Sequence, residues 1–123
     1  TLELLRFMKE LPNSFLRTSF IVGHPNETQE MFDEMCEFAE TFGFDRINVF
    51  SYSDEETTPA FDMDEKIPQE VIAQRAEILG EIAHNSMQRS LKKEIGKEIE
   101  LIVDAQSDEH EYLLSARKTM WAP

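Results

Sequence analysis

Cysteine is nearly absent from this 123-residue chain, in which Cys36 is the only one. A single thiol cannot form a disulfide within the chain, and it cannot supply the several thiolates that a cysteine-based metal cluster requires. The chain also lacks a signal-peptide pattern, so the cysteine usage predicts a cytoplasmic protein. No apolar run approaches the roughly 20 residues of a membrane-spanning helix, and we therefore expect no membrane partner.

Positive charge is scarce as well. Twelve Lys and Arg stand against 25 Asp and Glu, which gives a formal net charge of −13 at pH 7. Such a surface repels the phosphate backbone of a nucleic acid and favours a basic protein partner. The best candidate for a local basic patch lies between residues 89 and 98, where acids alternate with the bases in the manner of a solvated helix end.

Apolar periodicity predicts three helices and two buried strands in the first 94 residues. The expected helices cover residues 2–11, 26 or 28 to 42, and 68–94, and the expected strands cover residues 15–22 and 46–51. Both strands carry apolar residues on the two sides of the pleat, which predicts a sheet covered on both faces. At the start of the second helix, Asn26 and Gln29 fit a capping box.

After Gly96 the apolar period changes to two. Residues 98–104 and 111–117 flank a polar turn, a pattern typical of an antiparallel hairpin. The order of elements predicts an α/β unit, residues 1–94, followed by the beginning of an all-β unit, residues 95–123. Because the chain opens inside an expected helix and stops soon after an expected strand, we expect it to be a piece of a larger protein.

The sequence places a candidate site where the two strands end. In residues 17–28, RTSFIVGHPNET, an apolar run breaks at a Gly/Pro turn and an acidic amphipathic helix follows. Residues 47–53, INVFSYS, repeat the pattern of a buried strand running into a polar turn. The carboxyl edge of a parallel sheet is where α/β proteins bind ligands. His24 lies in the first turn, where it either contacts a ligand or is structural. No P-loop and no Ser/His/Asp elbow is present, so the residues locate a site without giving a reaction.

The same two segments resemble motifs of one enzyme family. Residues 17–28 resemble the fifth-strand signature R-T-x-F-I-V-G-F-P-G-E-T of the radical S-adenosylmethionine methylthiotransferases, and residues 49–60 resemble the sixth-strand motif V-F-x-Y-S-x-E-x-G-T-x-A. The hairpin after Lys97 is similar to the opening of the TRAM β-barrel that ends these enzymes. The resemblance implies the last two βα units of a partial TIM-type radical-SAM barrel, then a long helix and the first hairpin of a TRAM barrel.

The resemblance leaves two branches of this family as alternatives. One methylthiolates an adenosine in tRNA, and the other, RimO-like, methylthiolates an aspartate of a small-subunit ribosomal protein. Arg17, Thr18 and Glu55 resemble the RimO-like branch. Residues 97–118 hold six acids and three bases, which suits a basic protein better than RNA. We expect the ribosomal-protein substrate; the tRNA-modifying branch and a non-enzymatic acidic interaction module are the alternatives.

The resemblance also implies cofactors. The parent enzyme would use S-adenosylmethionine and two 4Fe-4S clusters to insert sulfur at an unactivated C–H bond and methylate it. The family's cluster motif, C-x-x-x-C-x-x-C, is absent, so we expect no metal-binding or catalytic residue here and no activity from this chain alone. The residues implied to face S-adenosylmethionine are Arg17, Gly23, Pro25, Tyr52 and Ser53, with Arg17 meeting a carboxylate.

Three positions depart from the family motifs. His24 and Asn26 replace the usual Phe and Gly, and Asn tolerates a positive φ, so the first turn can survive. Thr57 replaces the loop Gly and predicts a different loop path. Two barrel strands taken alone also leave strand edges and apolar side chains exposed, so we expect a homo-oligomer of this chain.

Overall fold

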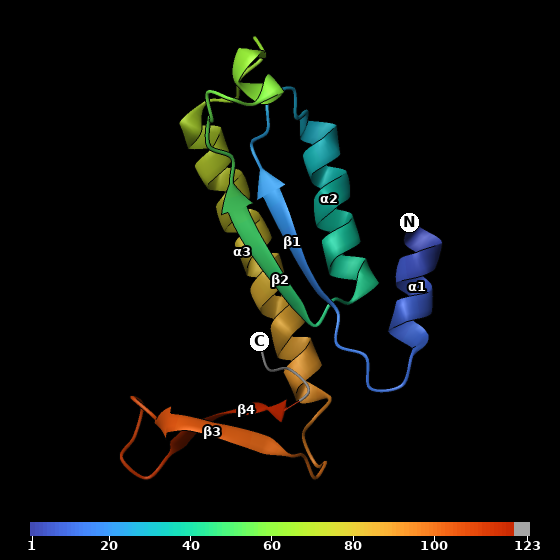
Figure 1. Ribbon diagram of the computed structural model, residues 1–123, viewed down its shortest axis with the longest axis vertical. Helices are drawn as coiled ribbons and strands as arrows, with labels where there is room; N and C mark the ends of the chain where they lie inside the picture. Colours follow the sequence, from blue (N-terminus) through green and yellow to red (C-terminus); the bar gives the residue numbers. More distant parts are fainter. Residues whose placement is uncertain (120–123) are drawn as a thin grey trace. The chain divides into compact units, whose positions relative to one another are not determined.

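The structure, a computed structural model, describes residues 1–119 and has a mixed α/β fold (Figure 1). Its elements are α1 (Leu2–Glu10), β1 (Arg17–Val22), α2 (Gln29–Phe42), β2 (Arg46–Ser51), a 3-10 turn η1 (Pro59–Asp62), α3 (Gln69–Lys92), β3 (Leu101–Gln106) and β4 (Leu114–Lys118). One compact unit is Leu16–Lys92, and Thr1–Phe15 with the chain from Lys93 onward forms another. The last residues of the expected second unit, 120–123, lie outside the described part.

Strands β1 and β2 form a parallel pair, and α2 provides the crossover that such a pair requires. Their register runs without a shift from Arg17 opposite Arg46 to Val22 opposite Ser51. The amide of Tyr52 donates to the carbonyl of Val22 at 2.8 Å, just past the last pair. Both strands therefore end at the same edge.

The helices bury one face of this pair. The buried apolar side chains are Leu16, Val22, Phe32, Ala39, Phe42, Phe44, Ile47, Ile72, Leu79, Ile82 and Ala83. On the other face, Ile21 and its register partner Phe50 are each 55% exposed. Within residues 1–119 the helices cover one face of the pair, and the exposed apolar side chains on the other face agree with the expectation for two such strands taken alone.

The start of α2 differs from the expected capping box. Thr28 lies in an extended conformation directly before the helix, and its hydroxyl accepts from the amide of Met31 at 3.2 Å. Asn26 instead has a φ of +70° and its amide donates to the carbonyl of Glu65 at 2.9 Å. The prediction of an Asn26–Gln29 box is therefore wrong, although Asn26 does adopt the positive φ that the sequence permits. Gly43, with a φ of +83°, ends the helix as expected.

Helix α3 is the longest element and ends two residues before the expected Glu94. It packs along β2 and against α2, and its buried residues follow a helical stripe. None of the helices within residues 1–119 is long and apolar enough to cross a membrane. The loop before α3 is not wholly irregular, because η1 forms one turn within it.

The remaining elements bury little. Helix α1 has no buried residue. The hairpin of β3 and β4 is antiparallel, as predicted, and contains an irregularity between Val103 and Ala105. All of β3 is exposed. Lys118 at the end of β4 forms a 2.9 Å ion pair with Glu94, and both side chains are less than one-fifth exposed.

Candidate functional site at the carboxyl ends of β1 and β2

The turn after β1 is built on a glycine. Gly23 is buried and has a φ of +86°, a conformation that side chains rarely adopt. A Cβ at this position would lie 2.5 Å from Cγ1 of Ile72, on α3. The backbone of the turn thus approaches the helix more closely than any other residue type allows.

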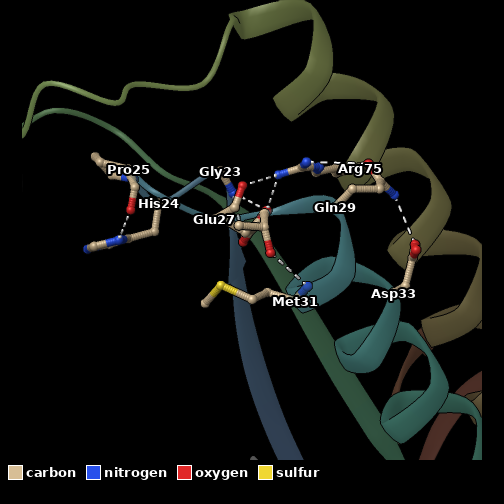
Figure 2. Close-up of polar contacts among 9 residues, drawn as sticks. Gly23, His24, Pro25, Glu27, Gln29, Met31, Asp33 and Arg75 are labelled. Atoms are coloured by element: carbon tan, nitrogen blue, oxygen red, sulfur yellow. Dashed lines mark hydrogen bonds and ion pairs between the residues drawn. The ribbon is translucent and has the colours of Figure 1, made fainter.

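A buried ion pair holds the residues that follow (Figure 2). Oε1 of Glu27 lies 2.6 Å from Nη1 of Arg75, and the side chains are only 6% and 8% exposed. Nη1 also donates to the carbonyl oxygen of Glu27 at 3.2 Å, and Nη2 donates to the side-chain oxygen of Gln29 at 3.4 Å. The amide of Gly23 donates to the Glu27 carboxylate, at 3.3 Å from each oxygen. Within the described chain, Nε of Arg75 is buried without a partner.

Two rings lie at the edge itself. Nδ1 of His24 is 2.9 Å from the carbonyl oxygen of Pro25, and the ring of His24 meets that of Tyr52 edge-on, with centroids 5.5 Å apart. The Tyr52 hydroxyl is buried and has no hydrogen-bond partner of normal geometry among the described residues. Loss of solvation, followed by the neighbouring Asp54 carboxylate, raises the pKa of Tyr52. An unpaired buried hydroxyl is a group that a bound ligand could satisfy.

The loop after β2 folds back through a charged contact. Nζ of Lys66 lies 2.7 Å from Oδ1 of Asp54, and it also stands 4.7 Å from the centre of the Phe61 ring. The Lys66 ammonium, and then the Tyr52 hydroxyl, lowers the pKa of Asp54. This loop is therefore ordered by its own side chains close to the site.

The structure brings four of the five expected cofactor residues together. Gly23 and Pro25 follow β1 directly, and Tyr52 and Ser53 follow β2 at the same edge. Arg17 opens β1 and lies at the opposite end of the strand, about 20 Å of extended chain away. It lies on the face that the helices leave uncovered. With the Asn48 amide turned so that its oxygen faces the guanidinium, Nη2 and Nε of Arg17 donate to it at 3.2 and 3.3 Å.

Sequence reasoning missed the Glu27–Arg75 pair. In the sequence, Glu27 is one of several acids of an acidic amphipathic segment, and nothing in its own neighbourhood distinguishes it. A signal for Arg75 exists, since it lies on the apolar stripe of α3 between Ile72 and Leu79, three and four residues away. A charged residue in such a stripe requires a buried partner.

The described chain offers no set of ligands for an iron–sulfur cluster. No group of three or more His, Cys, Asp or Glu in residues 1–119 could hold a metal ion. Cys36 is half-buried on α2, and burial, followed by Asp33 and Glu40, raises the pKa of its thiol. Residues 1–119 therefore bring together no ligand set for such a cluster.

The fold and its strand-end turns define a βα-type protein with a candidate ligand site at the carboxyl edge, and comparison with known proteins shows to which family it belongs. No family model matches the chain. It is 73% identical over 123 residues to the ribosomal protein uS12 methylthiotransferase RimO of Sulfurimonas denitrificans. It is 62% identical over 122 residues to the protein of the same name from a Sulfurovum species, and 57% identical over 121 residues to that from Aliarcobacter butzleri.

These matches cover 98–100% of this chain and 27–28% of each relative. The chain belongs to the RimO family of methylthiotransferases. The chain spans little more than a quarter of the length of these relatives. The prediction of a RimO-like protein, made from the two strand-end motifs, is confirmed.

Proposed function

We propose that this chain is part of a radical-SAM methylthiotransferase and supplies two neighbouring strand ends to its S-adenosylmethionine site. In this proposal, residues 1–94 are the last two βα units of a TIM-type barrel, and residues 95–123 begin a TRAM barrel. The in-register parallel pair, with both strands ending at one edge, carries the proposal. In a barrel of this kind the carboxyl edge holds the active site.

Gly23, Pro25, Tyr52 and Ser53 would line the cofactor site. The close backbone turn at Gly23 and the buried hydroxyl of Tyr52, which has no hydrogen bond of normal geometry among the described residues, support this assignment. Arg17 lies on the uncovered face, which would point inward in a closed barrel, but at the amino end of β1; its proposed contact with the cofactor carboxylate therefore rests on the family motif. Bound S-adenosylmethionine would supply the methyl group and the radical chemistry, and the two iron–sulfur clusters would be held by residues outside this chain.

The substrate we propose is a basic ribosomal protein, acted on in the cytoplasm. The relatives are named as methylthiotransferases of ribosomal protein uS12. The net charge of −13 supports a basic protein over a nucleic acid. A pull-down with the full-length protein at about 0.15 M salt tests this. We expect uS12 to bind and naked tRNA not to bind; the reverse result would favour the tRNA-modifying branch.

The cofactor assignment has a matched control in the chain. Arg17 and Arg46 are register partners on the same face of the sheet. In the full-length protein, Arg17→Ala should weaken S-adenosylmethionine binding about 10-fold or more, because a hydrogen bond to a charged group contributes ~1.5–3 kcal/mol. Arg46→Ala should leave the affinity unchanged in isothermal titration calorimetry. Equal affinities for the two variants would remove Arg17 from the site.

Association of this chain with copies of itself is also proposed. Ile21 and Phe50 on the uncovered face, and the free edge of β2 within the described residues, support it. Sedimentation of the 123-residue chain at micromolar concentration should show a dimer or a higher oligomer. A compact monomer whose unfolding does not depend on concentration would contradict this.

A further inference from the structure

The turn that leads from β1 to α2 is tied to α3 by a buried charge. Glu27 lies in the turn and Arg75 on the helix, 48 residues further along the chain. We propose that Glu27 and Arg75 are positioning residues that set the geometry of the S-adenosylmethionine turn, an inference that rests on the proposed function.

The contacts form a continuous path to both strand ends. Arg75 holds the Glu27 carboxylate at 2.6 Å, and that carboxylate accepts from the amide of Gly23. The Val22–Gly23 peptide group is thus held on both sides, because the carbonyl of Val22 accepts from the amide of Tyr52 at 2.8 Å. Fixing one peptide plane therefore fixes the first residue after β1 and the first residue after β2.

The chemistry of the Glu27–Arg75 pair favours a role in positioning the turn over a role in stability alone. Replacing a buried ion pair by apolar side chains of similar volume is often neutral or stabilising, so packing alone does not require charges here. Every oxygen of the Glu27 side chain is directed at the turn amide of Gly23, and Oε1 also at Arg75. An apolar residue would fill the space and leave the Gly23 amide without an acceptor.

The test compares variants of the full-length protein. Glu27→Met keeps the volume and removes the acceptor, whereas Glu27→Gln keeps one oxygen that can accept from Gly23. The control is Ser86→Ala, which removes a buried hydrogen bond from α3 to the carbonyl of Phe44, at the other end of the strands. Each variant is measured by calorimetric titration with S-adenosylmethionine, by urea unfolding, and by amide hydrogen exchange of the peptide that covers residues 22–28.

We expect Glu27→Met to raise the Kd about tenfold or more, since small misplacements of a binding group are costly, and to speed exchange in residues 22–28. Glu27→Gln should recover part of the affinity. Ser86→Ala should lower the urea midpoint and leave both the Kd and the exchange of this peptide unchanged.

Unchanged Kd and exchange in folded Glu27→Met overturn the inference, as does a Kd that rises equally in Ser86→Ala. If Glu27→Met does not fold, Glu27→Gln and Arg75→Lys decide by the same two measurements. A wild-type protein that binds no S-adenosylmethionine overturns the proposed function itself. Wild-type binding with unaffected variants overturns only the positioning role.

Discussion

At the amino end of the β1–β2 pair the contacts come from aromatic rings and single hydrogen bonds, whereas the carboxyl end adds a buried ion pair. Phe44 packs against Phe38 and Phe42, with ring centroids 5.6 and 4.5 Å apart. Nearby, Asp45 accepts from the amide of Leu16 and from the hydroxyl of Ser90, each at 2.7 Å. These contacts fill space and close the chain around the core.

The carboxyl end also buries apolar side chains, among them Val22 and Ile72, but it keeps polar groups under constraint as well. Its buried residues include Glu27 and Arg75, and the Tyr52 hydroxyl there has no partner of normal geometry within residues 1–119. The barrel that we propose would separate its tasks in this way, with stability at the amino face and ligands at the carboxyl face. The two ends should therefore respond differently to substitution.

The largest effect is expected at the amino end. Phe44 is 3% exposed, and Phe44→Ala should lower the free energy of unfolding by about 3–5 kcal/mol, the usual cost of removing a buried ring. Urea unfolding followed by circular dichroism measures it. The control is Phe50→Ala, at a side chain that is 55% exposed and should lose much less. Equal losses would mean that the aromatic cluster is not the core.

Gly23→Ala tests the carboxyl end. The left-handed backbone costs an L residue ~1–2 kcal/mol. The overlap of the new Cβ with Ile72 costs a further ~1–3 kcal/mol. In the full-length protein, S-adenosylmethionine affinity should fall along with the urea midpoint, whereas Phe44→Ala should change stability more than affinity. A Gly23→Ala protein with wild-type stability would show that α3 can move away from the turn.

At a second glycine, substitution by alanine should change the free energy of unfolding in the opposite direction. Gly80 lies within α3, and a Cβ added there would meet nothing within 4 Å. Gly80→Ala should raise the free energy of unfolding by ~1 kcal/mol, because Gly is the poorer helix former. The urea midpoint should rise while the Kd for S-adenosylmethionine stays constant. A loss of stability would show that the open space beside residue 80 is filled in solution.

The smallest effect is expected from the Asp54–Lys66 contact. Lys66 lowers the pKa of Asp54 below its ordinary value of 3.8. A carboxyl whose folded pKa is lowered stabilises the fold above the unfolded pKa, and this contribution disappears as the pH falls through the folded pKa. Lys66→Met should therefore make the unfolding midpoint less dependent on pH below about 4. Lys93→Met changes the net charge by the same amount and should leave this pH dependence unchanged. If the unfolding midpoints of the two variants depend on pH in the same way below about 4, the Asp54–Lys66 contact does not form in solution.

Much of the fold was predictable because it follows from local patterns. The bounds of β2, Arg46–Ser51, and the hairpin were predicted from apolar periodicity. The end of α2 followed from Gly43, which adopts the left-handed conformation that ends a helix. The family was also predictable, because the two strand-end segments resemble its signature motifs.

The features that the sequence did not predict depend on three-dimensional geometry that the periodicity of apolar residues does not encode. Whether Asn26 or Thr28 caps α2 depends on the φ and ψ of each residue, and two residues of similar capping propensity stood two positions apart. The pairing of Glu27 with Arg75 joins positions 48 residues apart.

The two turns at the carboxyl edge also differ in how they would tolerate changes of length during evolution. Between Gly23 and Thr28, nearly every residue makes a specific contact, with partners as distant as Glu65 and Arg75. Inserting or deleting one residue there would shift the Glu27 carboxylate away from the Gly23 amide. The stretch around η1 hydrogen-bonds mainly within itself, for instance from Thr58 to Glu55. Insertions and deletions among natural variants should therefore gather in residues 55–63 and be rare in the first turn.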